Sequence, residues 1–147
     1  MKITLRDITQ DNFQECIHLS VCAEQGKFIS SNTYSIAESK IFSFWIIKAI
    51  YAAEIMVGFL MYAKDNKNGI LDLARLMIDC KFQGKGYGKE ALNCLLSIAK
   101  EDEEIDRIGI HVEKENEDAK QFYKKYGFEE LRMMEYGEEV FILRINR

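Results

Sequence analysis

The apolar and polar positions of this chain follow a period of two in some stretches and a period near 3.6 in others. The first kind, rich in Ile, Val, Tyr and Phe, predicts β-strands, which we place at 2–8, 44–52, 55–63, 70–79, 107–112, 128–136 and 139–145. The second kind predicts helices, which we place at 12–22, 33–40, from the stretch 82–89 to about 101, and from Asn116 or Asp118 to 126–127. The order β-α-α-β-β-β-α-β-α-β-β predicts a mixed α/β (α+β) fold with a central, mostly antiparallel sheet flanked by about four helices.

The ends of the predicted helices must be set by capping residues and glycines, because the chain contains no proline. Asp11 is placed to cap the first helix, and Ser31 or Asn32 to cap the second. Gly127 follows the last helix and suits the left-handed conformation in which many helices end. The second and third strands are expected to form a hairpin that turns near 52–54.

The stretch 41–63 is largely apolar and long enough to cross a bilayer. It also contains Lys48 and Glu54, and charges at bilayer depth are costly. Its content of Ile, Val, Tyr, Phe and Trp is typical of two buried strands with a turn between them. We therefore expect a hairpin here and no membrane partner.

Length and charge narrow the class of protein. The chain has 147 residues, which fits one domain spanning 1–147. Its net charge of −4 disfavours a nucleic-acid partner, because such proteins are usually basic. The same charge suits a cationic substrate, although the simpler interpretation is that it aids solubility. The N-terminus has no apolar secretory segment, so we expect a cytoplasmic protein.

Four cysteines and two histidines are present, and their spacing does not complete a zinc-binding pattern. We therefore expect no metal. No C-x-x-C pair occurs either, so free thiols in a reducing compartment are the expected state. The cysteines are Cys16, Cys22, Cys80 and Cys94.

The strongest chemical signal is a glycine-rich stretch that follows a predicted strand and opens a predicted helix, Gln83-Gly84-Lys85-Gly86-Tyr87-Gly88. Glycine allows positive φ and close approach of the backbone to a ligand. The free N–H groups and positive dipole end of a helix N-terminus favour a phosphate. A dinucleotide-binding G-x-G-x-x-G would need glycine at Lys89, and the spacing of a P-loop is not met. A glycine turn without a ligand is the alternative.

A second signal lies in the last predicted helix and the strand after it. Ala119 and Tyr123 are four residues apart and share one helix face. The small side chain at 119 permits close approach of another body. Taken alone, this pattern is more typical of a packed amphipathic helix than of a binding site.

Together the two segments resemble the acetyl-CoA motifs of the GNAT acetyltransferase superfamily. Its loop motif [QR]-x-x-G-x-[GA] is met by Gln83, Gly86 and Gly88. Its helix motif N-x-x-A-x-x-x-Y-x-x-x-G-F is met by Asn116, Ala119, Tyr123, Gly127 and Phe128. The stretches 8–17, 25–37 and 57–62 are also similar to bacterial spermine/spermidine (diamine) acetyltransferases.

The resemblance implies one GNAT-like domain that takes acetyl-CoA as co-substrate and acetylates a small-molecule amine. It implies that the backbone of the central strand pairs with the pantetheine arm, and that the loop amides hold the pyrophosphate. The cofactor-binding residues would then be Leu76, Met77, Ile78, Gln83, Gly84, Lys85, Gly86, Tyr87, Gly88, Lys89, Asn116, Ala119 and Tyr123. The Tyr123 hydroxyl would protonate the departing thiolate, and a homodimer is possible.

The identity of the proton acceptor is the open part of this hypothesis. Many relatives carry an acid on the central strand where this chain has Ala74. Asp72 lies two residues earlier on the same strand face, so it is the candidate base, and it is also a candidate for binding the amine. Glu24, Glu38 and Glu54 are further candidates for binding a cationic substrate. His111 is interpreted as a packed or rim residue.

Three functions remain in competition. The first is acetylation of a polyamine or diamine such as spermine or spermidine. The second is acetylation of another small amine or of a protein amine. The third is a non-catalytic sensor of acyl-CoA, which the absence of an acid at Ala74 favours and the intact Tyr123 opposes.

Overall fold

Seven strands form one sheet in the computed structural model, which describes residues 2–147. Their order across the sheet is β1-β2-β3-β4-β5-β7-β6, and the pairing is antiparallel except between β4 and β5. The strands are β1 (Ile3–Arg6), β2 (Ile46–Ala52), β3 (Ile55–Asp65), β4 (Ile70–Ile78), β5 (Arg107–Glu113), β6 (Glu129–Glu135) and β7 (Glu138–Arg144). The predicted element order and the mostly antiparallel sheet are confirmed.

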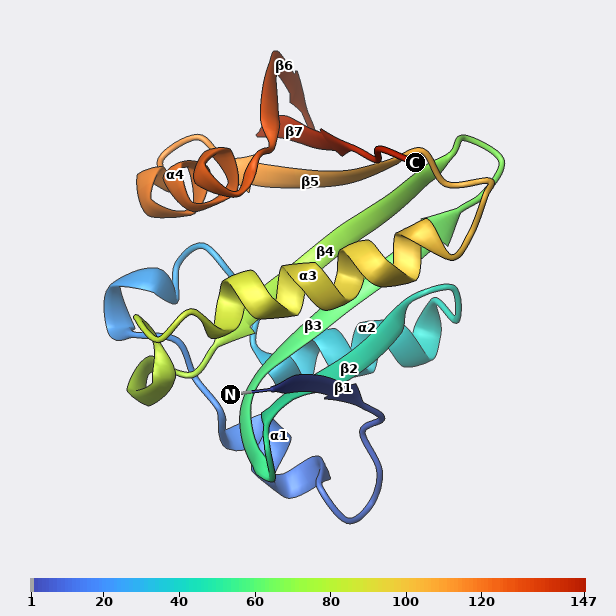
Figure 1. Cartoon of the computed structure of the whole chain (residues 1–147). Helices are drawn as coiled ribbons and strands as arrows, with labels where there is room; N and C mark the ends of the chain where they lie inside the picture. Colours follow the sequence, from blue (N-terminus) through green and yellow to red (C-terminus); the bar gives the residue numbers. More distant parts are fainter. Residues whose placement is uncertain (1) are drawn as a thin grey trace.

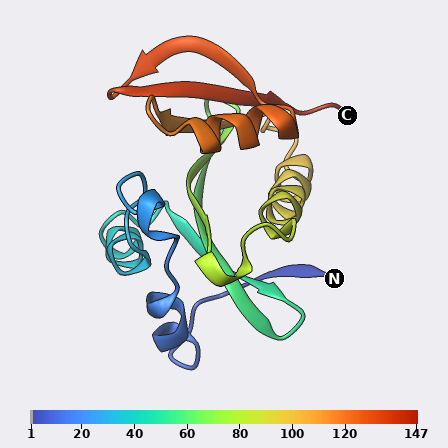
Figure 2. The same ribbon diagram turned by 90° about the vertical axis from the view of Figure 1, so that its left-hand side faces the viewer.

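Helices cover both faces of this sheet (Figures 1 and 2). They are α1 (Phe13–His18), α2 (Asn32–Ile41), α3 (Tyr87–Lys100) and α4 (Glu117–Tyr126), with 3₁₀ turns at Ala23–Gln25 and Cys80–Phe82. Leu92 and Leu95 of α3 pack with Leu71 and Phe141 in the larger core. Cys16 of α1 packs with Phe59, Met61 and Met77 in a smaller core on the opposite face. The sheet is therefore the middle of three layers.

The stretch 41–63 is a pair of strands, as its composition indicated. After the last residue of α2 and a short loop, β2 and β3 pair antiparallel through the turn at Ala53, which has a φ of 54°. Most side chains of β3 are buried, which accounts for their apolar character. Within residues 2–147, no helix is long and apolar enough to cross a membrane.

Two of the three expected helix caps are present. The Ser31 hydroxyl accepts a hydrogen bond from the backbone N–H of Tyr34 at 3.1 Å, at the start of α2. Gly127 ends α4 with a φ of 128°. The expected cap at Asp11 is wrong, because α1 begins at Phe13 and Asn12 is its N-terminal flanking residue.

The first helix is also much shorter than the expected 12–22, because contacts with the residues that follow β4 hold the next residues in an extended path. The Ser20 N–H donates to the Asp79 carboxylate at 2.9 Å, and the Ser20 carbonyl accepts from Cys80 N–H at 2.8 Å. These tertiary hydrogen bonds take the place of helical ones. Leu19, with a ψ of 139°, is already in an extended conformation. The apolar spacing of the sequence carried no sign of them.

The expectation of four free thiols is wrong for one pair. Cys22 and Cys80 are joined by a disulfide whose Cα atoms lie 4.7 Å apart. They are 58 residues apart in the sequence, so spacing alone did not reveal their proximity. Cys16 and Cys94 are free.

The parallel pair β4 and β5 separates partway along its length. Their register runs from Ile70 opposite Arg107 to Leu73 opposite Ile110, whereas β4 continues to Ile78 and β5 to Glu113. Ala74 is an extra residue at this point, because Met61 of β3 pairs with Arg75 and Tyr62 pairs with Leu73. Such a bulge bends the strand that carries it. The outer half of β4 is left with no strand beside it on the β5 side.

Candidate active site

The glycine-rich stretch forms the turn between β4 and α3, and its conformation requires glycine. Gly84 and Gly86 have φ values of 78° and 84°, in the region that other residues avoid. A Cβ on either would meet no atom within 4 Å, so this turn faces open space rather than the protein interior. Glycine is needed here for backbone conformation and not for packing.

The start of α3 leaves its backbone donors available. Gly86 is the N-terminal flanking residue, and no side chain caps the helix. The first N–H groups of an α-helix have no partner within the helix. Together with the dipole of this 14-residue helix, they form a site that favours a phosphate.

Gly88 and Gln83 have structural roles in this turn that do not involve a ligand. A Cβ on Gly88 would lie 3.2 Å from the Phe122 ring, so this glycine lets α4 pack closely against α3. The Gln83 side-chain amide donates to the Ile78 carbonyl at 2.9 Å and to the Gln25 side chain at 2.8 Å. Gln83 therefore braces the turn with its side chain.

A cavity of about 450 Å³ extends from this turn along the free edge of β4. Most of the sequence-predicted cofactor residues line it: Leu76, Met77, Ile78, Gln83, Gly84, Gly86, Tyr87, Gly88, Lys89, Asn116, Ala119 and Tyr123. Lys85 does not line it and is exposed. We call this space the donor cavity. Its free strand edge and its uncapped helix end fit an extended, amide-bearing arm that ends in phosphates.

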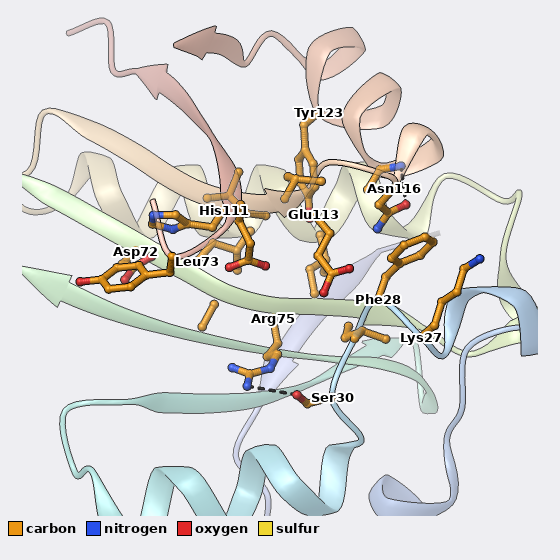
Figure 3. A pocket seen from close by; sticks show the side chains of 18 of the residues that line it. Lys27, Phe28, Ser30, Asp72, Leu73, Arg75, His111, Glu113, Asn116 and Tyr123 are labelled. Carbon is orange, nitrogen blue, oxygen red and sulfur yellow. Dashed lines mark hydrogen bonds between the residues drawn. The ribbon is translucent and has the colours of Figure 1, made fainter. Parts of the chain in front are cut away.

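A second cavity of about 530 Å³ lies next to it, on the side of α2, and we call it the acceptor cavity (Figure 3). Six segments of the chain contribute to its lining. These residues include Lys27, Phe28, Ser30, Trp45, Asp72, Ala74, Arg75, His111, Glu113, Tyr136 and Glu138. Six residues line both cavities, namely Phe28, Ile29, Leu76, Asn116, Ala119 and Tyr123.

Tyr123 stands at the junction of the two cavities. Only 6% of its surface is exposed, and its ring makes edge contacts with Phe122 and Phe128 at 5.1 and 5.4 Å between centroids. Burial raises the pKa of its phenol well above the ordinary value. Its hydroxyl has no hydrogen-bond partner among residues 2–147, so the one polar atom of a buried side chain is free for a ligand.

Asp72 and His111 lie near each other in the acceptor cavity, at the end away from Asn116 (Figure 3). Burial raises the pKa of the Asp72 carboxyl, and the nearby His111 opposes this shift in part. The His111 Nε2 lies 3.2 Å from a Glu135 carboxylate oxygen of β6. The prediction that His111 is a rim residue is consistent with this position, but the cavity beside it was not foreseen.

Two acids of the acceptor cavity were missed by the sequence reasoning. Glu113 of β5 and Glu138 of β7 are directly opposite in the antiparallel register and line the same cavity. The signal was present in the alternation of β5, where Ile110 and Val112 are buried and His111 and Glu113 are less so. What no pattern supplied was the pairing of β5 with β7.

Two positively charged side chains, Arg75 and Lys27, also line this cavity, and neither forms an ion pair with Glu113 or Glu138. Arg75 donates to Glu38 of α2 at 3.0 Å and to the Ser30 hydroxyl at 3.3 Å, so its charge is paired. The Lys27 ammonium lies 5.0 Å from the centre of the Phe28 ring. Neither Glu113 nor Glu138 has an ion-pair partner in the described part of the chain.

Glu24 and Glu54 do not lie where the sequence analysis expected substrate-binding acids. Glu54 is in the β2–β3 turn, lines neither cavity, and pairs with Arg6 at 3.1 Å. Glu24 is exposed on the 3₁₀ turn Ala23–Gln25 and also lines neither cavity. Both expectations rested on residue type alone, which carries no information on position.

Comparisons with known proteins agree with this geometry. The family described as "Acetyltransferase (GNAT) family" matches residues 5–128. The chain is 30% identical to the spermine/spermidine N(1)-acetyltransferase of Bacillus subtilis over 97% of this chain and 98% of that one. Its fold is similar to that of the PaiA N-acetyltransferase of Thermoplasma acidophilum in complex with coenzyme A (TM-score 0.73, 18% identity, 98% and 99% of the two chains). It is similar also to the spermidine N-acetyltransferase of Vibrio cholerae in complex with CoA and spermine (TM-score 0.73, 16% identity, 98% and 96%).

Proposed function

We propose, from the premise that the chain belongs to the GNAT family of acetyltransferases, that it acetylates a primary amine of a polyamine such as spermine or spermidine. The acyl donor is acetyl-CoA, as in the family. The observation that carries the choice of a polyamine is the unpaired acid pair Glu113 and Glu138 beside the acetyl-transfer point at Tyr123. The near full-length identity with a spermine/spermidine acetyltransferase supports it.

Each wall of the donor cavity would bind a different part of acetyl-CoA. The backbone N–H groups at the start of α3 would hold the pyrophosphate, and the free edge of β4 from Leu76 to Ile78 would pair with the pantetheine arm. The Asn116 side chain caps α4 by accepting from Ala119 N–H at 3.2 Å. Its amide group is left to donate a hydrogen bond to the arm. When bound, acetyl-CoA supplies the activated acetyl thioester.

The acceptor must reach the thioester as a neutral amine. A free alkylammonium has a pKa near 10.4, so about one molecule in a thousand is neutral near pH 7. Asp72 is our candidate for taking the proton, directly or through a water molecule. Its burial supports this role, because the raised pKa of the carboxyl makes it a stronger base than an exposed aspartate. His111 beside it can share the proton through its contact with Glu135.

Tyr123 is our candidate for the general acid. As the amine nitrogen bonds to the acetyl carbon and the carbon–sulfur bond breaks, a phenol at the junction can give its proton to the leaving thiolate. The buried phenol stays protonated at neutral pH, since its pKa is raised. The nitrogen, which is cationic once it has bonded to the acetyl carbon, gives its extra proton back to the phenolate, directly or through water. The products are then an N-acetylamine and a free thiol, with the phenol restored.

The acid pair gives the site a reason to prefer a substrate with more than one positive charge. Side chains directly opposite in an antiparallel pair have Cβ atoms roughly 5 Å apart, and like charges at this distance are destabilising. A cation between Glu113 and Glu138 would relieve their repulsion. A polyamine can place one ammonium there while another amine is acetylated.

The experiment is to measure thiol release from acetyl-CoA with spermine, spermidine, putrescine, a monoamine of similar length, amino acids and a lysine peptide. We expect turnover with the polyamines and a KM for the monoamine at least about tenfold higher. Turnover confined to the peptide or to amino acids would contradict the polyamine assignment while retaining the acetyltransferase. Binding of acetyl-CoA without any turnover would favour the sensor.

Variants test the acid pair itself. Glu113→Gln and Glu138→Gln should each raise the KM for spermidine by about tenfold and leave the KM for the monoamine unchanged, because a paired charge is lost only with the polyamine. Glu103→Gln, an exposed acid outside both cavities, is the matched control. Equal effects on the KM for the monoamine and for spermidine would mean that the acid pair does not determine the preference for polyamines.

A further inference from the structure

A covalent bond joins the two sides of the donor cavity. Cys80 follows β4 and precedes the glycine-rich turn, and Cys22 begins the segment that leads into α2. We refer to residues 21–30 as the wall segment. Val21, Gln25, Phe28 and Ile29 of this segment line the donor cavity. Residues 27–30 also line the acceptor cavity.

Few other contacts hold the wall segment against the turn. At one end, Ser20 bonds to Asp79 and Cys80, as described above. In the middle, the side-chain amides of Gln25 and Gln83 donate to each other at 3.1 and 2.8 Å. The remaining backbone hydrogen bonds of the segment are local, such as Phe28 N–H to the Gln25 carbonyl at 3.0 Å. The disulfide is thus the one covalent tie between this wall and the phosphate-binding turn.

The two joined cysteines differ from the other two in their surroundings. Burial raises the pKa of the Cys16 thiol to about 11 and raises that of Cys94 as well. Both are therefore held as unreactive thiols at neutral pH. Cys80 is exposed at the surface, so a small thiol or disulfide can reach it.

We infer that Cys22 and Cys80 are a thiol–disulfide exchange site that sets the affinity of the donor cavity for acetyl-CoA. The oxidant is a low-molecular-weight disulfide. The Cys80 thiolate attacks one of its sulfurs and displaces one thiolate, and a mixed disulfide forms. The Cys22 thiolate then attacks the Cys80 sulfur and displaces the second thiolate. Two electrons pass from the two cysteines to the small disulfide, which leaves as two thiols.

The direction of the effect follows from preorganisation. With the disulfide closed, the wall segment is fixed beside the turn before the ligand arrives, so binding costs less ordering. With two thiols, the same wall depends on the amide pair and on the bonds of Ser20. The oxidised protein should therefore bind coenzyme A more tightly and release it more slowly. This rests on the donor cavity alone and not on the choice of amine.

The test uses the full chain with oxidised glutathione or a phosphine reductant as the two treatments. A thiol count should give two free thiols after oxidation and four after reduction, as the sequence and the disulfide require. Calorimetric titration with coenzyme A should give a Kd about fivefold lower for the oxidised protein. Tryptic cleavage after Lys27 should be slower in the oxidised protein, because the wall segment opens less often.

Variants decide the matter. Cys80→Ser and Cys22→Ser should match the reduced protein under both treatments, whereas Cys94→Ser should respond as the unaltered chain does. Four thiols after oxidation would overturn the exchange site. A Kd and a cleavage rate that stay the same when the thiol count changes would overturn its effect on the cavity. Neither outcome depends on which amine is acetylated.

Discussion

The donor and acceptor cavities lie side by side and share six residues, but they are built in different ways. The donor cavity comes mainly from two continuous stretches, the end of β4 with its glycine turn and the start of α4, and it offers backbone groups. The acceptor cavity combines side chains from the wall segment, Trp45 before β2, β4, β5, α4 and the β6–β7 hairpin, several of them charged. The first is therefore a local structure, and the second is a product of the topology.

This difference predicts that the two cavities respond differently to substitution. A phosphate held by backbone amides needs glycine and a helix end, which constrain few side chains. An acceptor held by carboxylates depends on which side chains the strands bring together. Substitutions in the donor cavity should affect every acceptor alike, whereas substitutions in the acceptor cavity should discriminate between amines.

The largest effect is expected at the junction of the two cavities. Tyr123→Phe should lower kcat by about 100-fold, as loss of a general acid does, and should change the Kd for coenzyme A less than about twofold. The ring and its contacts with Phe122 and Phe128 remain. Rapid-mixing kinetics with a polyamine and with a monoamine should give the same loss, since the leaving thiolate is common to both.

Tyr126→Phe is the matched control for this variant. Tyr126 is on the same helix, but its hydroxyl donates to Asn93 at 2.7 Å and it lines neither cavity. We expect its kcat to be close to that of the unaltered chain. If both variants lost activity alike, the packing of α4 and not the Tyr123 hydroxyl would be responsible.

A smaller loss, confined to the donor side, is expected for Gly86→Asp. The new residue is strained at a φ of 84° and places a negative charge beside the phosphates. The Kd for coenzyme A should rise about 30-fold, and the KM for the amine at saturating acetyl-CoA should stay within about twofold. Gly137→Asp introduces similar strain in the β6–β7 turn, with a φ of 80°, away from the phosphates. An equal loss of coenzyme A affinity in both variants would contradict the assignment of the glycine turn.

The same contrast determines how much of the molecule the sequence predicted. The strands, their order and the last two helices follow from apolar spacing and from Gly127, because these signals are local. Tyr123 and the turn at Gly86 were predicted from motifs of neighbouring residues, and both line the donor cavity. The pairing of Glu113 with Glu138 and the disulfide between Cys22 and Cys80 depend on residues far apart in the chain, and no local pattern contains them.

The first helix shows that topology can also overrule a local pattern. Spacing alone continued it to residue 22, yet the bonds of Ser20 with Asp79 and Cys80 end it at His18. Glu54 shows the converse error, in which an acid was chosen by type and proved to be paired with Arg6. Candidate residues chosen without a position are the ones most exposed to such errors.

A still smaller effect should come from Asp72, the proposed base in the acceptor cavity. Asp72→Asn should lower kcat/KM about tenfold at neutral pH, because the proton must then leave through water or His111. Since burial raises the pKa of the Asp72 carboxyl, activity that depends on its ionised form is lost as pH falls through this raised value. The variant should not show this loss of activity at acidic pH. It should keep the pH dependence that comes from protonation of the amine. An unchanged profile would remove Asp72 from the reaction.

The melting temperature separates this loss from a loss of folding. A carboxyl with a raised pKa in the folded state favours folding when protonated, and that contribution disappears as pH rises through the folded-state pKa. At pH 7 the ionised Asp72 therefore destabilises the folded state. The neutral amide of Asp72→Asn should leave the melting temperature unchanged or higher, so reduced activity would not reflect unfolding.

The last prediction is that kcat shows no fall at alkaline pH. Burial raises the pKa of Tyr123 well above that of a free phenol, so the general acid keeps its proton while an exposed tyrosine would lose it near pH 10. The kcat at saturating substrates should thus not fall between about pH 8 and pH 10. A fall in kcat near pH 10 that vanishes in Tyr123→Phe would mean that water enters the junction when both substrates are bound. In that case the two cavities would be one solvated space during the reaction, and the contrast between them would hold only for the free protein.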